Sequence, residues 1–416
     1  MGEVMAVPKL RFKEFDGDWI SKKIIDLADY VDYRGKTPKK VESGILLVTA
    51  KNIKQGYLDY SASQEFIEES AFDDVMRRGK VELNDVLITT EAPLGNVASV
   101  DRTDIALAQR VIKYRGKIGL LDNLFLKQKF LSESFQEILK SKATGGTVQG
   151  IKGSVLHQIP LIVPSKQEQT KIASFLSTVD EKISQLTQKH ALLSQYKQGM
   201  MQKLFSQQIR FKADDGSEFG EWGEYKIFDL AIDKTLNNGV FNDQNKVGKG
   251  YKLINVLDMY IQRDIDESRL SLLDIDKKEF ERNKVNYGDI FFTRSSLVKE
   301  GIAFSNVYLG VSNDITYDGH LIKLSPDLNI IEPKFLNYCL KVAYVRKQLI
   351  QGGKTATMTT IGQQEVGNTL VKIPCLEEQI RIANFLSAID QKIEVVAQQI
   401  EQAKQWKKGL LQQMFV

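Results

Sequence analysis

Hydrophobic residues recur at seven-residue intervals in two long stretches of the chain. In the first stretch they define two seam positions, one held by Ile172, Val179, Leu186, Leu193 and Met200 and the other by Leu176, Ile183, His190, Lys197 and Leu204. The same pattern runs from Ile382 to Met414 in the second stretch. Such a seam predicts long helices with a coiled-coil face. Each stretch follows a proline, Pro164 or Pro374, which favours a helix that begins sharply.

The two stretches belong to an internal repeat. Pro164 to Ile183 matches Pro374 to Ile393 in an unbroken register. Fainter echoes precede each copy: Arg11-Phe12-Lys13 recurs as Arg210-Phe211-Lys212, Asp85 to Thr89 as Asp289 to Thr293, and Gly145-Gly146 as Gly352-Gly353. The chain is therefore predicted to hold two copies of one unit, a variable domain followed by a spacer helix. The predicted boundaries are 1–163 and 164–207 for the first copy, and 208–373 and 374–416 for the second.

The order of these segments predicts how the two helices pair. The second variable segment starts immediately after the first helix, and the termini of a domain commonly lie close together. The end of the first helix and the start of the second should therefore be neighbours, which makes the pair antiparallel. The same geometry brings the two ends of the chain together, so we expect a nearly circular molecule with pseudo-two-fold symmetry.

Short apolar runs bounded by turn residues predict β-strands in the variable segments. In the first copy they cover residues 44–49, 85–90 and 156–163. Residues 121–131 and their counterpart 331–340 have the periodicity of an amphipathic helix. The predicted fold class is α+β, with two similar mixed α/β domains joined by two long helices that form an antiparallel coiled coil.

Composition excludes several classes of protein. Two cysteines and three histidines cannot supply a disulfide framework or a spaced metal cluster, and no metal site is expected. No apolar run approaches the ~18 residues of a membrane span. These features indicate a cytoplasmic protein that does not interact with membranes. The net charge of +4 leaves open whether nucleic acid is a partner.

No catalytic motif emerges from the sequence. Gly352-Gly-Lys-Thr355 resembles the end of a phosphate-binding P-loop, but Gln348 stands where that motif needs a glycine. Nucleophile elbows, zinc-protease motifs and dinucleotide fingerprints were not found. We therefore expect a non-catalytic chain that holds no cofactor of its own.

Several of these motifs together resemble a known family. Each long helix opens with a proline and a Glu-Gln pair, Glu168-Gln169 or Glu378-Gln379, followed by Ile-Ala-x-Phe-Leu. The loop Gly35-Lys-Thr-Pro38 and the strands after Asp85 and Asp289 add to the pattern. In these features the chain resembles the specificity (S) subunits of Type I restriction-modification systems.

The sequence departs from the family's pattern at two places. Asn84 stands before Asp85, where the family usually has a glycine such as Gly288. The second domain has Asn237-Asn-Gly-Val-Phe in place of a clear Gly-Thr-Pro loop.

The resemblance implies a DNA-recognition subunit of an endonuclease and adenine-methyltransferase complex. Each domain would read one half of an asymmetric bipartite target on double-stranded DNA, and the helices would set the spacer length and dock two methyltransferase (M) subunits. Two restriction-translocase (R) subunits would complete the complex. S-adenosylmethionine would belong to the methyltransferase partner, and ATP and Mg²⁺ to the motor-nuclease partner. The alternative is a bivalent coiled-coil adaptor with two protein-binding domains and no DNA.

Polar loop residues are the candidates for DNA contact, because Arg, Lys, Asn and Thr side chains can bind base edges or phosphates. The candidates in the first domain are Arg34, Lys36, Thr37, Thr89, Thr90, Thr147 and Lys152, and those in the second are Asn238, Arg294, Ser295, Ser296, Lys354, Thr355 and Thr357. Arg294, directly after a predicted strand, is the strongest candidate for a guanine contact. For any of these residues the alternative is a solvated loop position without a ligand.

Aromatic residues outside the seam are candidates for partner docking, present twice because the helix is present twice. They are Phe175, Tyr196, Phe205, Phe385, Trp406 and Phe415. The alternative is that these rings cap the seam or pack on the domains.

Overall fold

The computed structural model describes residues 7–33, 38–261 and 263–415. It divides into two compact units, Met1–Gln188 with Ala397–Val416 and Lys189–Val396. Each unit holds one variable domain together with parts of both long helices, so the compact units cut across the predicted segment boundaries. The reason is that each domain packs on helical residues from both copies of the repeat.

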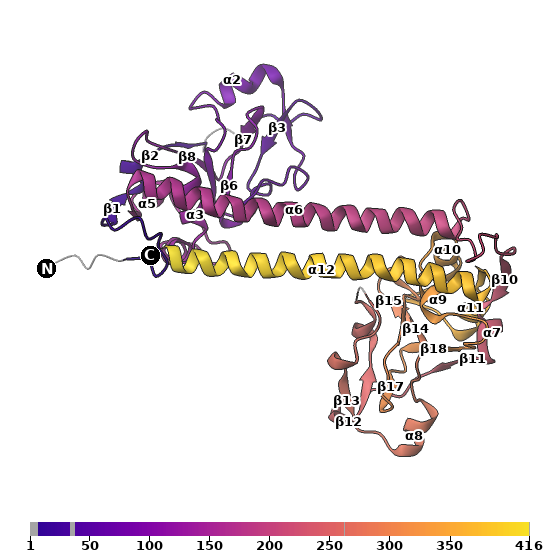
Figure 1. The fold of residues 1–416 in the computed structure, drawn as a ribbon. Coiled ribbons are helices and arrows are strands. Elements are labelled where there is room, and N and C mark those ends of the chain that lie inside the picture. The colour runs from indigo at the N-terminus through magenta and orange to yellow at the C-terminus, as the bar shows by residue number, and fades with distance from the viewer. Residues whose placement is uncertain (1–6, 34–37, 262, 416) are drawn as a thin grey trace. The chain divides into compact units, whose positions relative to one another are not determined.

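The domain of the first unit is mixed α and β (Figure 1). Its elements are β1 (Ile20–Lys23), α1 (Ile24–Leu27), β2 (Ala28–Asp32), β3 (Ile45–Val48), β4 (Phe66–Ile67), a 3-10 turn (Glu69–Ala71), α2 (Phe72–Val75), β5 (Val86–Thr90), β6 (Leu94–Ser99), β7 (Ile105–Leu107), β8 (Val111–Gly116), α3 (Asn123–Leu131), α4 (Glu133–Ser141), α5 (Gly153–Leu156) and β9 (Pro160–Val163). The strands form a four-stranded sheet in the order β2-β8-β5-β6, a three-stranded sheet β4-β3-β7 and the pair β1-β9.

The domain of the second unit repeats this topology. Its elements are β10 (Gly223–Lys226), α7 (Ile227–Leu230), β11 (Ala231–Asn238), β12 (Val247–Ile254), β13 (Ser271–Leu273), α8 (Lys277–Arg282), β14 (Ile290–Thr293), β15 (Ser295–Ser296), β16 (Ser305–Val307), β17 (Ile315–Tyr317), β18 (Leu321–Pro326), α9 (Pro333–Cys339), α10 (Ala343–Gly352), β19 (Lys354–Thr355), β20 (Thr359–Thr360), α11 (Gln363–Gly367) and β21 (Leu370–Ile373), with short 3-10 turns between some of them. The sheets β11-β18-β14-β16, β13-β12-β17 and β10-β21 match those of the first domain. A further small sheet, β15-β20-β19, is formed from loop segments.

Local sequence signals account for where the predicted helices begin. Asp122 caps α3 by accepting hydrogen bonds from the Leu124 and Phe125 amides. In the second domain Glu332 caps α9 in the same way, and Pro333 occupies its first turn. The predicted strands at 44–49 and 85–90 are β3 and β5, whereas the run at 156–163 contains strand only from Pro160 because Gly153–Leu156 is helical.

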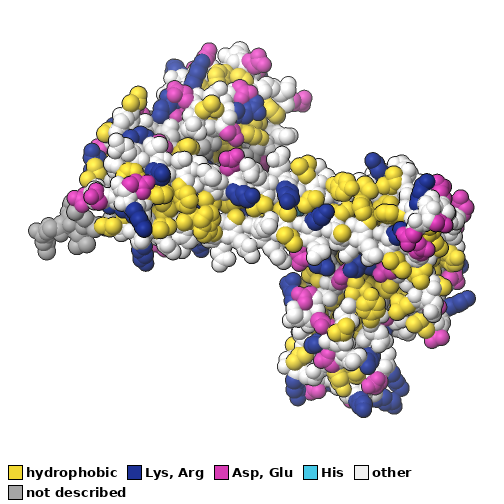
Figure 2. Space-filling model, in the orientation of Figure 1, with side chains coloured by type: hydrophobic (Ala, Val, Ile, Leu, Met, Phe, Trp, Pro, Cys, Tyr) yellow, Lys and Arg dark blue, Asp and Glu magenta, His cyan; other side chains and the backbone are white. Residues whose placement is uncertain are grey.

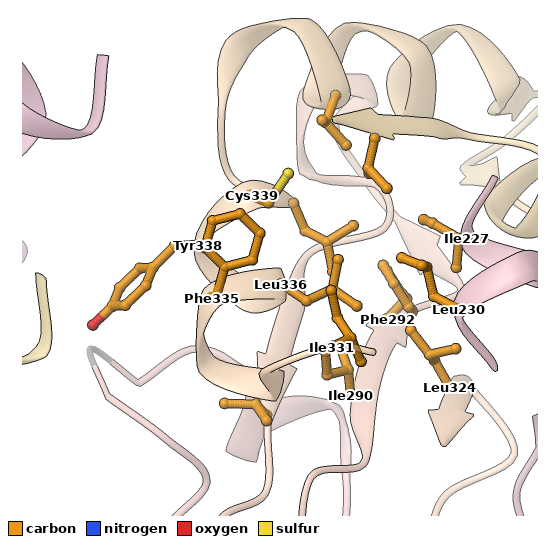
Figure 3. Close-up of a cluster of buried hydrophobic side chains, with 14 of the residues drawn as sticks. Ile227, Leu230, Ile290, Phe292, Leu324, Ile331, Phe335, Leu336, Tyr338 and Cys339 are labelled. Carbon is orange, nitrogen blue, oxygen red and sulfur yellow. The ribbon is translucent and has the colours of Figure 1, made fainter. Parts of the chain in front are cut away.

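The core of the second domain lies between the four-stranded sheet and α9. Ile290 and Phe292 from β14 meet Phe335 and Leu336 from α9, all of them fully buried (Figure 3). The equivalent core of the first domain packs Ile88 and Ile112 against Phe125 and other residues of α3. In both units this core is continuous with the apolar face of a long helix, which explains why domain and helix form one compact unit.

The two long helices are α6 (Lys166–Phe205) and α12 (Leu376–Met414). In the first unit Asp180, in the first half of α6, pairs with Lys407, near the end of α12, at 2.5 Å. In the second unit Lys197 of α6 pairs with Asp390 of α12 at 2.6 Å. A residue early in one helix thus contacts a residue late in the other, so the predicted antiparallel pairing is confirmed within each unit.

The predicted closeness of the chain ends is seen in the first unit. The Leu10 amide donates a hydrogen bond of 2.9 Å to the Gln413 carbonyl in the last turn of α12. Together with the repeated domains and the paired helices, this contact agrees with the fold class predicted from sequence.

Lys197 and Lys407 occupy seam positions that hydrophobic residues fill elsewhere. Their side chains are only 21% and 14% exposed, and each meets an aspartate of the opposite helix. A partly buried charge needs its partner, so each pair favours one helix register over the alternatives. The two lysines that interrupt the heptad pattern are therefore register-determining residues.

The Asp180 ion pair predicts a specific acid sensitivity. Burial raises the pKa of Asp180, but Lys407 and Lys127 outweigh it and lower the pKa overall. A carboxylate whose pKa is lowered in the folded state stabilises that state above its unfolded pKa of about 4, and the stabilisation is lost as the pH falls below that value. In urea unfolding between pH 6 and pH 2, Asp180→Asn should therefore show a shallower loss of stability with acid than the wild type.

Glu181→Gln is the matched control, because it changes the neighbouring carboxylate on the exposed face of α6. That variant should follow the wild-type profile. Identical acid profiles for Asp180→Asn and the wild type would contradict the prediction.

Candidate nucleic-acid interface

The Glu-Gln pair that opens each long helix anchors the domain to the helix. Glu168 is 1% exposed and accepts hydrogen bonds of 2.8 Å from Arg11 Nε and Nη2, and a third from Trp19 Nε1. Gln169 accepts a hydrogen bond from the Asp122 amide and donates to the Leu120 and Pro164 carbonyls. These contacts join the N-terminal segment, the start of α3 and the start of α6.

The second unit makes the same anchor with its own residues. Glu378 binds Arg210 and Trp222, and Gln379 bonds the Glu332 amide and the Ile330 carbonyl. The faint sequence echo between Arg11 and Arg210 thus marks the two partners of the buried glutamates. The role of the Glu-Gln motif in this structure is to position the domain.

The buried aspartates before β5 and β14 are structural as well. Asp85 is 1% exposed and is bound by Arg115 through two hydrogen bonds of 2.7 Å, with Lys113 at 3.4 Å. In the second unit Lys323 lies 3.3 Å from Asp289, and burial raises the pKa of Asp289 although Lys323 opposes the shift. Neither carboxylate is available to a ligand.

The residue before each aspartate explains the departure noted in the sequence. Asn84 has φ 68° and Gly288 has φ 91°, so both adopt the left-handed conformation that L residues other than Asn and Asp seldom adopt. Each amide donates a hydrogen bond of 2.8 Å to a carbonyl of the next antiparallel segment, that of Val100 or Tyr308. Asparagine therefore replaces glycine here without changing the turn.

The small sheet β15-β20-β19 brings together most of the candidates of the second domain. Ser295 and Ser296 pair with Thr360 and Thr359, which pair in turn with Lys354 and Thr355. Arg294, directly before β15, is exposed, and Thr357 lies in the exposed turn between β19 and β20. Segments more than fifty residues apart in sequence thus form one polar, hydroxyl-bearing surface, which we call the second loop cluster (Arg294–Ser296 and 354–360).

The first domain forms an equivalent cluster, the first loop cluster (Thr90, Glu91 and residues 144–152). Gly150 bridges both Glu91 and Thr144, and the Ile151 amide donates to the Thr90 carbonyl at 2.9 Å. Thr147 and Lys152 are exposed there. The structure thus places these two predicted residues beside the end of β5.

Two predicted contacts in the first domain are wrong on the ground of burial. Thr89 is fully buried, and its hydroxyl accepts a hydrogen bond from the Asn96 amide. Thr90 is 5% exposed. Every residue of β5 is buried because both faces of this central strand are covered, so the strand presents backbone but no threonine side chain to a ligand.

The remaining candidates lie apart from the clusters or beyond the described ranges. Asn238 ends β11 opposite Ile322, and its Oδ1 is buried without a hydrogen-bond partner among the described residues. Arg34, Lys36 and Thr37 lie outside the described residues, so their predicted contacts stay predictions.

The predicted docking aromatics separate into buried and exposed rings. Phe205 and Phe415 are 7% and 4% exposed and pack in the domain cores, so only a small part of either ring is accessible, and their docking role stays a prediction. Phe175 packs edge-on against Phe12 and Trp406, and Phe385 packs against Phe211. Tyr196 and Trp406 remain more than half exposed, at 52% and 55%.

Sequence reasoning missed a basic pocket beside the first loop cluster. It has a volume of about 340 Å³ and is lined by Pro38, Lys40, Leu47, Thr49, Ala50, Lys51, Glu65, Ala92, Ala108, Gln109 and Arg110. These residues come from β3 and the segments before and after it, from the residue before β4, from the segment after β7 and from the turn after β5, which only the fold brings together. A closer alignment of the two repeats would have paired Arg110 with His320 and could have drawn attention to this position.

Charges of both signs are mixed on the visible face of the molecule. On the face drawn in Figure 2, Lys and Arg side chains alternate with Asp and Glu side chains on the domains. This mixture agrees with the net charge of +4 and means that contact with a polyanion would depend on local clusters. Among the described residues, no group of His, Cys, Asp and Glu could hold a metal ion, and no helix is long and apolar enough to cross a membrane.

Comparison with known proteins decides the family. The family model described as "Type I restriction modification DNA specificity domain" matches residues 17–195 and 220–405, once for each repeat. The chain belongs to this family. It is a Type I restriction-modification specificity subunit, and its function is recognition of the DNA target.

Similar proteins cover nearly the whole of this specificity subunit. The Type I restriction enzyme MjaVIII specificity subunit of Methanocaldococcus jannaschii is 24% identical, over 96% of this chain and 94% of the relative. The StySPI specificity subunit of Salmonella potsdam is 21% identical, over 86% of this chain and 78% of the relative. These relatives are described as specificity subunits, which are non-catalytic.

Solved structures agree in fold. The crystal structure of a Type I restriction-modification S subunit from M. genitalium matches with a TM-score of 0.62 at 16% identity, over 99% of both chains. A chain from a study of complex assembly in the Type I system matches with a TM-score of 0.53, over 95% of this chain and 97% of the other. The predicted family and fold class are confirmed, and the family's DNA-specificity description favours DNA recognition over the adaptor alternative.

Proposed function

We propose that each domain of this specificity subunit reads one half of an asymmetric, bipartite DNA target. The observation that carries the proposal is that the two domains share one backbone framework but differ in the side chains that their loop clusters expose. The framework places a loop cluster at the end of β5 in one domain and of β14 in the other. Two readers of the same shape with different side chains should recognise two different short sequences.

The exposed groups suit the major groove of DNA. Arg294 and Lys354 supply positively charged donors, and Thr355 and Thr357 supply hydroxyl groups that can donate or accept hydrogen bonds. In the major groove each base pair presents a distinct pattern of donors and acceptors, so such side chains can discriminate all four base pairs. Surrounding lysines and arginines would hold the phosphates and make binding dependent on salt.

We propose that the ends of the two long helices dock two copies of one partner, the methyltransferase subunit. The second unit has a groove of about 740 Å³, in which Lys197, Gln198, Met201 and Gln202 of α6 face the turn between α9 and α10. The first unit has a groove of about 340 Å³, in which the repeat-related Lys407, Lys408, Leu411 and Gln412 of α12 face the turn between α3 and α4. One partner surface could bind both grooves because they are built from the same repeat positions.

The division of labour follows from this arrangement. The docked methyltransferase subunits would bring S-adenosylmethionine and transfer its methyl group to an adenine in each half of the target. Two restriction-translocase subunits would bring ATP and Mg²⁺ for movement and cleavage. The specificity subunit would contribute base recognition and the distance between the halves, which α6 and α12 would set because each helix contributes residues to both compact units.

Mapping methylated adenines across the genome of the source cell tests this function. The expected motif has two unlike short sequences separated by a spacer of fixed length and unspecified sequence. A strain that lacks this chain is the control, and it should lose methylation at that motif only. A palindromic motif, or methylation that persists without the chain, would contradict the proposal.

A further inference from the structure

We propose that Arg110 is the base-reading residue of the first domain and contacts a guanine of its half-site. This inference rests on the proposed function and adds the residue and the base that it would read. Arg110 lies in the turn between β7 and β8 and lines the basic pocket beside the first loop cluster.

Backbone hydrogen bonds place Arg110 where the second domain places His320. In the first domain the Thr90 amide donates to the Arg110 carbonyl at 2.9 Å, and in the second the Arg294 amide donates to the His320 carbonyl at 2.9 Å. The next contact is also shared, since Thr90 and Arg294 each accept a hydrogen bond from the isoleucine that follows the glycine-rich loop. Positions 90 and 110 are thus equivalent to positions 294 and 320.

The two domains have their arginine at different positions of this backbone pair. The second domain has Arg294 at the strand position and His320 at the turn position. The first domain has the buried Thr90 at the strand position and Arg110 at the turn position. Each domain therefore presents one guanidinium group from the same backbone junction, but from a different one of its two segments, and this difference would make the two half-sites unlike.

The surroundings of Arg110 leave much of its guanidinium exposed. Its side chain is 55% exposed, and among the described residues it forms an ion pair with Glu91 at 3.7 Å, which is longer than a hydrogen bond. Lys40 in the same pocket is engaged by Glu65 at 2.7 Å. A planar guanidinium with free donors can bond the O6 and N7 atoms of guanine together, which a lysine ammonium cannot do with the same geometry.

The backbone conformation at Arg110 indicates that the arginine is present for its function and not for the turn. Its φ is 68°, in the left-handed region that a residue with a Cβ adopts at a cost. Glycine would adopt this conformation without strain, so the turn itself does not call for arginine. Strained positions of this kind concentrate at functional sites.

The test compares methylation motifs of complete complexes that carry Arg110→Ala, Arg110→Lys or Arg110→Gly with the wild type. Each variant should relax one guanine position in one half of the motif, with ~10-fold or greater loss of discrimination at that position, and should keep the other half and the spacer. Arg110→Gly should also retain or raise the melting temperature, because it removes the backbone strain. This separates loss of recognition from loss of folding.

Arg102→Ala is the matched control, because Arg102 is another exposed arginine of this domain. It lies before β7, whereas Arg110 lies after β7, and it is paired with Asp104. It should leave the motif unchanged. An unchanged motif in all Arg110 variants would overturn the inference, as would an equal loss of binding at every sequence, which would indicate a phosphate contact. If the wild type shows no bipartite motif, the proposed function fails before the role of Arg110 is tested.

Discussion

Inserting four residues into each long helix should move the methylation target of this subunit to a longer spacer. The insertions are placed after Gln188 in α6 and after Gln398 in α12, between the two seam ion pairs in both helices. Four residues add about 6 Å of helix, which corresponds to roughly one or two base pairs at 3.4 Å each. Four residues also rotate the helix by about 40° beyond a full turn. This rotation is close to the rotation between neighbouring base pairs in DNA, so a spacer longer by one base pair is favoured.

The original target should lose methylation almost completely. With the wrong spacer one half-site cannot be read, and each unread base pair costs about 1–3 kcal/mol, so a half-site of a few base pairs predicts at least a hundredfold loss. Both helices must be extended because they pair antiparallel, and extending one alone would leave at most one of the two seam ion pairs in register.

The control replaces four residues at each of the same two places with the inserted sequence, which leaves both helix lengths unchanged. That variant should keep the wild-type spacer. If the doubly extended subunit also keeps the wild-type spacer, the helices do not set it, and that part of the proposed function is wrong.

Gln169→Leu should cause a large loss of stability for a single substitution. It leaves the Leu120 and Pro164 carbonyls and the Asp122 amide without the partner they have in the native structure. A buried polar group that loses its partner costs about 1–3 kcal/mol, so a decrease of about 3 kcal/mol or more in the free energy of unfolding is expected. Urea unfolding of the full chain measures it.

The repeat offers an internal replicate, because Gln379→Leu removes the same three contacts in the second unit and should have a similar effect. Gln185→Leu is the control, since Gln185 lies on the exposed face of α6 and bonds only Glu181 of the same helix among the described residues. It should change stability by less than about 0.5 kcal/mol. A loss below about 1 kcal/mol for Gln169→Leu would show that water replaces the lost partners.

These anchors give the Glu-Gln motif a physical meaning. Glu168 and Gln169 connect three separate segments at the start of α6, and their counterparts do so at the start of α12. A domain fixed to the helix in this way presents its loop cluster at a constant position relative to that helix. A protein that recognises two separated half-sites would need each domain to be held rigidly in this way.

The sequence by itself determined the repeat, the long helices, their antiparallel pairing and the family. Each of these depends on a periodic pattern or on connectivity. The heptads extend over the full helices. The aspartates that Lys197 and Lys407 meet across the seam were seen only in the structure.

Tertiary structure alone decided which polar and aromatic residues remain accessible. Thr89 and Thr90 read as loop-facing residues in sequence, but they lie in a central strand covered on both faces. Phe205 and Phe415 end their helices like docking residues, but the domains fold over them. Arg110 became a candidate only when the β5-β8 ladder placed it opposite Thr90. The physical reason is that local pattern sets helix and strand, whereas exposure depends on contacts between segments far apart in the chain, which no local pattern encodes.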